Sequence, residues 1–130
     1  KDVNGIIEGF QPDDAFIARL KQSDPNLTQF RYASEAYDAT ILAALAALVA
    51  KDDAGQSVAA TFQSVSVGGI KCTSFGECVD VLKTQDDIDY DGISGPVNIT
   101  AEGDISPAFY GLYTFNAENK FVLARGVFGG

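Results

Sequence analysis

The stretch YASEAYDATILAALAALVAK, Tyr32 to Lys51, is the longest apolar segment of the chain. Its many alanines have high helix propensity, so a helix is predicted from about Glu35 to Val49. The uncharged run between Asp38 and Lys51 has 12 residues, whereas a membrane span needs about 20. The segment is therefore predicted to be a buried core helix that lies close against a sheet.

Asp38 is a carboxylate near the start of this otherwise apolar helix. A carboxylate in the first turns of a helix can cap the free N–H groups or interact with the helix dipole. The alternative interpretation is that Asp38 fixes a hinge or a ligand site. The sequence leaves both interpretations open.

Composition narrows the class of protein. A chain of 130 residues can form one modest core, and 46% apolar residues argue against disorder. The net charge of -9 would be repelled by a phosphate backbone, so a nucleic-acid partner is not expected. Because the sequence lacks methionine and opens on Lys1, we expect a processed piece or part of a larger protein.

Helix and strand signals alternate along the chain and predict an α/β fold. Pro12 and two following carboxylates suit a helix start, and Phe16, Ile17 and Leu20 have helical spacing. The region from Ser66 to Ile70, which contains two glycines, is predicted to be a loop. The remaining expected elements are a strand around Ile6-Ile7, helices from Ser57 to Val65 and from Ser74, and strands at 96–100, 109–115 and 121–127.

Cys72 and Cys78 flank a helix start, because Ser74 and Glu77 fit a capping box. The five residues between the cysteines can fold back far enough to bring the thiols together. A disulfide is the favoured prediction for an exported chain, and two free thiols are the alternative. Two cysteines without histidine are too few ligands for a metal site, and no metal or cofactor is expected.

The acidic run from Asp87 to Gly92 partly matches a calcium-binding loop. Asp87, Asp89, Asp91 and Gly92 fit loop positions one, three, five and six. The twelfth position, which should be a bidentate glutamate, is Asn98. A solvated acidic turn before a strand is therefore the prediction.

The groups that most enzymes use are missing from the sequence. There is no histidine, which excludes Ser-His-Asp and Cys-His pairs. No phosphate-binding glycine motif is present, and the paired carboxylates lie in predicted turns. We therefore expect a protein that is not an enzyme.

An ordered set of short motifs resembles the C-terminal part of the leucine/isoleucine/valine-binding-type (type I periplasmic) substrate-binding proteins of ABC transporters. The ordered set is more specific than any one of its motifs, and it covers nearly all of the 130 residues. Its members are Asn4-Gly5-Ile6-Ile7, Asp14 to Lys21, Ala36-Tyr37-Asp38-Ala39, Gly69 to Cys78, Asp87 to Gly92, Ser94-Gly95-Pro96-Val97, Glu102-Gly103-Asp104 and Tyr110 to Phe115.

The resemblance implies a fragment of a two-lobed flytrap fold, with helices packed on short-stranded sheets. Residues 1–26 would end the second lobe, residues 27–105 would return to the first lobe, and residues 106–130 would form the final crossover and strands of the second lobe. The implied protein is extracytoplasmic, either periplasmic or a cell-surface lipoprotein. It would capture a small polar ligand, an amino acid of the branched-chain type, for an ABC importer permease.

The resemblance also implies a set of ligand-binding residues. Asn4 falls where some members of the family hold the ligand ammonium with a carboxylate, and Gly5 follows it. Tyr32 falls near an aromatic residue that lines the cleft, and Ser34 and Glu35 are close enough to reach it. A turn role for Asn4 and ordinary packing for Tyr32 are the alternatives.

Two alternative functions remain open. These are a ligand-sensing domain of the same fold and a non-catalytic protein-interaction module. Exposed apolar faces would let the fragment self-associate.

Overall fold

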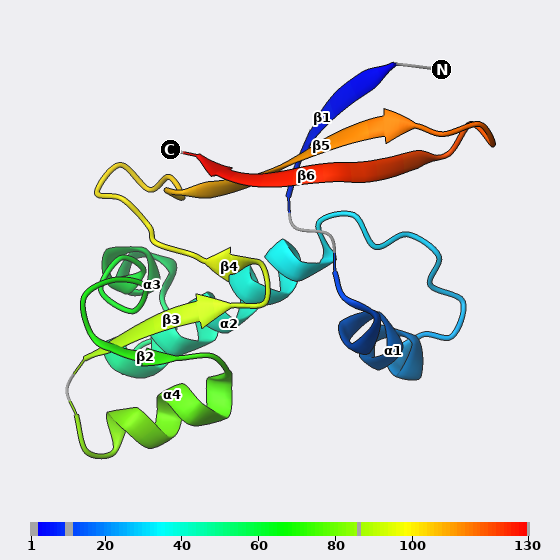
Figure 1. Cartoon of the computed structure of the whole chain (residues 1–130). Helices are drawn as coiled ribbons and strands as arrows, with labels where there is room; N and C mark the ends of the chain where they lie inside the picture. The colour runs from blue at the N-terminus through cyan, green and yellow to red at the C-terminus, as the bar shows by residue number, and fades with distance from the viewer. Residues whose placement is uncertain (1–2, 10–11, 86, 130) are drawn as a thin grey trace.

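The computed structural model describes residues 3–9, 12–85 and 87–129, and these residues have an α/β fold. Four helices and two small three-stranded sheets are present in the described residues (Figure 1). The elements are β1 (Asn4–Glu8), α1 (Asp14–Ser23), α2 (Ala33–Ala50), α3 (Gly55–Thr61), β2 (Ile70–Cys72), α4 (Phe75–Leu82), β3 (Ile88–Gly92), β4 (Gly95–Pro96), β5 (Ala108–Phe115) and β6 (Phe121–Gly129).

One unit is built on the sheet β2-β3-β4, with β2 parallel and β4 antiparallel to β3. The helices α2 and α4 pack against this sheet, and α3 packs against α2 (Figure 1). Its apolar core contains residues from α2, α4, β2 and β3, from the segment before β2 and from the position directly after β4. The buried core residues are Leu42, Leu45, Ala46, Val65, Cys72, Cys78, Ile88, Tyr90 and Val97.

Helix α2 confirms the predicted central helix and begins slightly earlier than expected. Its composition and its 18 residues would be sufficient for a membrane span, which by itself is weak evidence. The buried residues instead follow a stripe of four-residue spacing, Ser34, Asp38, Leu42 and Ala46, beside Leu45. Side chains four residues apart lie on the same helix face, so α2 serves as a core helix with one face on the sheet.

Local capping signals place the starts of two other helices. The Asp13 carboxylate caps α1 by accepting a hydrogen bond from the Phe16 N–H at 2.7 Å. The Ser74 hydroxyl caps α4 by accepting from the Glu77 N–H at 3.3 Å. The Phe16 ring then packs edge-on against Tyr37 of α2, with the ring centres 5.3 Å apart. Gln11, part of the predicted start of α1, lies outside the described residues.

The second unit is the antiparallel sheet β1-β5-β6, which pairs the start of the chain with its end (Figure 1). Ile7 of β1 faces Gly111 of β5, and β5 and β6 form the predicted hairpin. The turn between them is closed by a hydrogen bond from the Asn116 N–H to the Lys120 carbonyl at 2.9 Å. No helix in the described residues covers this sheet as α2 and α4 cover the other.

Several predicted elements differ from the structure. Ile70 was expected at the end of a loop, but it is the first residue of β2. This strand has three residues, which is too short to show a periodic pattern. The acidic run was predicted to be a solvated turn, and this is wrong because Ile88–Gly92 is a strand with a buried beginning. The strand expected at 96–100 is reduced to β4 and a single bridge between Ile99 and Ile105. Helix α3 ends at Thr61 instead of Val65.

The predicted lobe boundaries remain a prediction. Residues 4–8 and 108–129 share one sheet, and the helices and strands from α2 to β4 form the other unit. Helix α1, which the resemblance places with the second lobe, contacts α2 through Phe16 and Arg19.

Candidate ligand site

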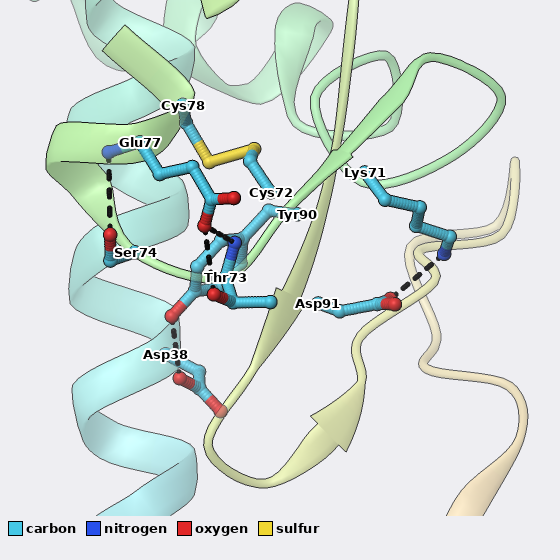
Figure 2. Close-up of a disulfide and its surroundings, with 9 residues drawn as sticks. All are labelled: Asp38, Lys71, Cys72, Thr73, Ser74, Glu77, Cys78, Tyr90 and Asp91. Atoms are coloured by element: carbon cyan, nitrogen blue, oxygen red, sulfur yellow. Dashed lines mark hydrogen bonds and ion pairs between the residues drawn. A yellow bond between two sulfur atoms is a disulfide. The ribbon is translucent and has the colours of Figure 1, made fainter. Parts of the chain in front are cut away.

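Asp38 lies at the centre of a hydrogen-bond network inside the protein. Its carboxylate is fully buried and accepts a hydrogen bond from the Tyr90 hydroxyl at 2.8 Å (Figure 2). It accepts another from the Ile93 N–H at 3.0 Å. It also accepts from the backbone N–H and the hydroxyl of Ser94. A buried carboxylate without such partners would be very costly. Asp38 therefore holds the turn between β3 and β4 against α2.

The groups around Asp38 are adapted to it. A Cβ atom at Gly92 would collide with the Asp38 carboxylate, so this position requires glycine. Burial raises the pKa of the Tyr90 phenol well above its ordinary value of 10.0, and the hydrogen bond to Asp38 raises it further. The phenol therefore keeps its proton and remains a donor to Asp38 over the whole physiological pH range.

The turn that Asp38 holds also touches the other unit. Gly95 follows Ser94 directly and has φ +108°, a conformation that favours glycine. A Cβ atom at Gly95 would lie 3.1 Å from Cζ of Phe128, which belongs to β6. Asp38 thus positions the surface on which the ring of Phe128 rests, and this contact connects the two units.

A cavity of about 250 Å³ lies between the two units beside this contact. The sheet β1-β5-β6 supplies one wall, and α2 with the β3–β4 turn supplies the other. Such a concave site with aromatic walls and a few polar groups is typical of small-molecule binding. Its lining residues are Glu8, Gly9, Tyr32, Glu35, Ser94, Pro96, Val97, Ile105, Pro107, Ala108, Phe109, Tyr110 and Phe128.

The close approach of Gly9, Tyr32 and Glu35 defines one corner of the cavity. A Cβ atom at Gly9 would lie 2.9 Å from the Tyr32 ring and 3.0 Å from Oε1 of Glu35. Gly9 has φ +98°, and Tyr32 is in the left-handed region at φ 60°. A left-handed non-glycine residue costs about 1–3 kcal/mol, so the surrounding contacts must hold Tyr32 in this conformation. The end of β1 is therefore fitted closely to the start of α2.

A second cavity, of about 460 Å³, lies on the other side of the same corner. Glu8, Gly9 and Tyr32 line both cavities, and Arg31 and Phe121 line only the second. The two hollows are therefore adjacent and share these three residues.

The structure brings only part of the predicted ligand-binding set together. Tyr32 and Glu35 line the smaller cavity. Asn4 and Gly5 pair with Thr114 and Tyr113 at the far end of β1 and line neither cavity. At about 3.4 Å per residue, Asn4 is about 14 Å along the strand from Glu8. Ser34 is fully buried on the face of α2 that carries Asp38, and its hydroxyl has no partner among the described residues.

The cavity residues that were not predicted from the sequence include Glu8, Gly9, Ser94 and Phe128. Gly9 carried a signal, because a glycine that ends a strand often marks a close backbone approach. The other three carried none, since residues from separate segments become neighbours only after the two units meet.

The predicted disulfide between Cys72 and Cys78 is present, with Cα atoms 5.2 Å apart. It joins the end of β2 to the first turns of α4, and both cysteines are fully buried (Figure 2). Glu77 does not complete the expected capping box, because its carboxylate accepts from the N–H and hydroxyl of Thr73 at 2.8 Å. These hydrogen bonds lower the pKa of Glu77.

The acidic strand β3 is neutralised in part by Lys71. The Lys71 ammonium lies 2.9 Å from Asp91 (Figure 2) and 3.0 Å from Asp89. These contacts raise the pKa of Lys71. Parallel pairing of β2 with β3 places these groups together, as Lys71 is directly opposite Asp89. Among residues 3–9, 12–85 and 87–129, no group of three or more potential metal ligands is assembled.

One curated protein is similar in sequence to this chain. The chain is 36% identical over 87 residues to the chemotactic signal transduction system substrate-binding protein BasB of Halobacterium salinarum. The aligned part covers 64% of this chain and 21% of BasB, so the chain spans about a fifth of the length of this relative. No family model matches the sequence, and no solved structure matches it. The chain is thus similar to part of a substrate-binding protein.

Proposed function

We propose that this chain is part of an extracytoplasmic solute-binding protein that captures a small polar ligand for an ABC importer. The observation that carries the proposal is the cavity of about 250 Å³ lined from both units. A ligand that contacts both walls stabilises the closed arrangement, which is how hinged binding proteins couple capture to closure. The similarity to BasB supports a ligand-binding role.

The ligand in this proposal is an amino acid of the branched-chain type or a molecule of similar size. Typical ligand sites have volumes of about 300–1,000 Å³, so this smaller cavity suits a small ligand. Capture and release need no covalent chemistry, so the protein acts without catalysis. The buried disulfide is consistent with an oxidising, extracytoplasmic location.

The test is calorimetric titration of the full-length protein and of the 130-residue chain with a panel of free amino acids. We expect a panel member to bind the full-length protein, and Tyr32→Ala to weaken that binding because Tyr32 lines both cavities. Phe75→Ala is the matched control, since Phe75 is an exposed aromatic residue at the start of α4. Failure of the full-length protein to bind any member would refute the amino-acid assignment.

A second candidate function is ligand sensing, which the name of the relative favours. BasB is named for chemotactic signal transduction, and the same capture of a ligand serves transport or sensing equally well. A strain without this protein distinguishes the two roles. Loss of ligand uptake with normal swimming responses indicates an importer, whereas loss of attraction to the ligand with normal uptake indicates a sensor.

A further inference from the structure

Two segments of the chain have the pattern of an acceptor for an N-linked glycan, which is asparagine followed two residues later by serine or threonine, with no proline between them. They are Asn26-Leu27-Thr28 and Asn98-Ile99-Thr100. In an exported protein such a segment is modified where it lies on the surface, because a separate enzyme must reach both the asparagine and the hydroxyl residue. The fold gives the two segments different accessibility.

The first segment lies in an exposed turn that follows helix α1. Asn26 and Thr28 are both exposed, and Leu27 between them is half-buried. Asp24 closes the turn, because its carbonyl accepts from the Leu27 N–H at 3.1 Å and its carboxylate accepts from the Asn26 N–H at 3.0 Å. Within the described part of the chain, neither the Asn26 carboxamide nor the Thr28 hydroxyl takes part in a hydrogen bond. Both groups that the enzyme must reach are therefore available.

The second segment is held inside a closed turn. Asn98 is half-buried, its carboxamide oxygen is buried, and its backbone carbonyl accepts from the Ser106 N–H at 3.0 Å. The Thr100 hydroxyl accepts from the Asp104 N–H at 3.3 Å, and the Thr100 N–H donates to the Asp104 carbonyl at 2.7 Å. An enzyme that binds this threonine must first open the turn, so the folded protein protects the second segment.

We propose that Asn26 carries an N-linked glycan and that Asn98 does not. The inference rests on the extracytoplasmic location in the proposed function. The sugar donor is a lipid-linked oligosaccharide, in which C1 of the first sugar is bonded to a phosphate oxygen. Nδ2 of Asn26 forms a bond to C1 as the C1–O bond breaks, the lipid phosphate leaves with that electron pair, and Nδ2 gives up one proton. A separate glycosyltransferase catalyses the transfer, and this chain is only the acceptor.

Mass spectrometry of the full-length protein, isolated from fractionated cells that naturally produce it, tests the assignment. Trypsin releases Asn26 in the peptide of residues 22–31, which contains no other asparagine. We expect this peptide to carry the added mass of one or more sugars, and fragmentation of the other peptides to show Asn98 and Asn119 unmodified. Asn119 is the matched control, because it is exposed but has no hydroxyl residue two positions later.

The possible results separate the inference from the proposed function. An unmodified Asn26 in extracytoplasmic protein would overturn the inference and leave the proposed function intact. Protein confined to the cytoplasm would overturn both. A glycan on Asn98 would contradict the protection that the closed turn gives to the second segment.

Substitutions in the first segment show whether the pattern itself is recognised. Asn26→Gln and Thr28→Ala should each abolish the added mass, and the second of these leaves the acceptor nitrogen in place. Thr28→Ser should keep the added mass, because serine also supplies a hydroxyl. Circular dichroism confirms that each variant is folded. A glycan that persists in Thr28→Ala would contradict the assignment.

Discussion

At the scale of the residue, Asp38 organises the contact between α2 and the β3–β4 turn. It accepts four hydrogen bonds from groups 52 to 56 residues away in the sequence. The capping interpretation considered from the sequence does not describe these partners, since Asp38 lies inside the helix and bonds to another segment. The alternative, that Asp38 fixes a hinge or a ligand site, stays a prediction, and Asp38 reaches the cavity through Ser94, which it binds and which lines the cavity.

Substitution of Gly92 tests how closely this network is packed. Gly92→Ala should lower the free energy of unfolding by about 2–4 kcal/mol, because the new methyl group occupies the space of the Asp38 carboxylate. Gly76→Ala is the control, since Gly76 lies in α4 with open space around it. That change should raise stability by up to about 1 kcal/mol. Urea denaturation measures both, and equal effects would contradict the packing at Gly92.

Tyr90 gives a pH test of the same network. Its pKa is raised in the folded state, so above the ordinary value of 10.0 the unfolded chain loses a proton that the folded protein keeps. Stability is therefore full below pH 10 and falls above it, by up to about 1.4 kcal/mol per pH unit for this group. Tyr90→Phe should be about 1 kcal/mol less stable at pH 7 but lose less stability above pH 10. Parallel pH profiles of the two proteins in urea denaturation would refute this contribution.

At the scale of the element, short-range signals decide where helices begin and which helix packs in the core. Ser74 caps α4 as the sequence predicts, and the stripe on α2 faces the sheet. Helix α1 begins at Asp14 with Asp13 as its cap, so Pro12 lies before the helix and not in its first turn. The three-residue strand β2 was not predicted, because its extended backbone is stabilised by parallel pairing with β3. This contact joins segments that are distant in the sequence.

The disulfide is an element-scale constraint of modest strength. The loop between Cys72 and Cys78 is short, so its closure should stabilise the fold by about 2 kcal/mol. Reduction with dithiothreitol should lower the free energy of unfolding by that amount while the protein remains folded. The double variant Cys72→Ala/Cys78→Ala is the control and should not respond to the reductant. Complete unfolding on reduction would show that the disulfide stabilises the fold by more than loop closure alone predicts.

At the scale of the whole molecule, the sheet β1-β5-β6 and the residue before β1 expose several large apolar side chains. Exposed apolar patches of this kind promote association, and β1 and β6 are open edges that can pair with another chain. The net charge of -9 opposes association at low salt. The exposed residues are Val3, Ile6, Phe115, Phe121, Val122, Leu123 and Phe128.

We therefore expect the 130-residue chain to self-associate at high concentration, and more strongly in added salt, which screens the charge. Val122→Lys on the edge strand β6 should reduce the association. Phe75→Lys is the control on an exposed site of α4 away from this sheet. Sedimentation velocity measures the effect. A single monomeric species at all concentrations would contradict the expectation.

The sequence by itself determined the features that depend on neighbours along the chain. These are the central helix, the start of α4 at Ser74, the hairpin β5–β6 and the favoured pairing of Cys72 with Cys78. Helix propensity, capping and turn chemistry act over a few residues and therefore leave a readable pattern.

Only the tertiary structure decided the partners of Asp38, the pairing of β1 with β5 and the cavity between the two units. Glu8 and Glu35 are 27 positions apart and belong to different units, yet they line one cavity. The two residues line one cavity because β5, near the end of the chain, pairs with β1, and the end of β1 lies beside the start of α2. Contacts between distant segments are fixed by packing of the whole fold, and local sequence patterns do not encode them.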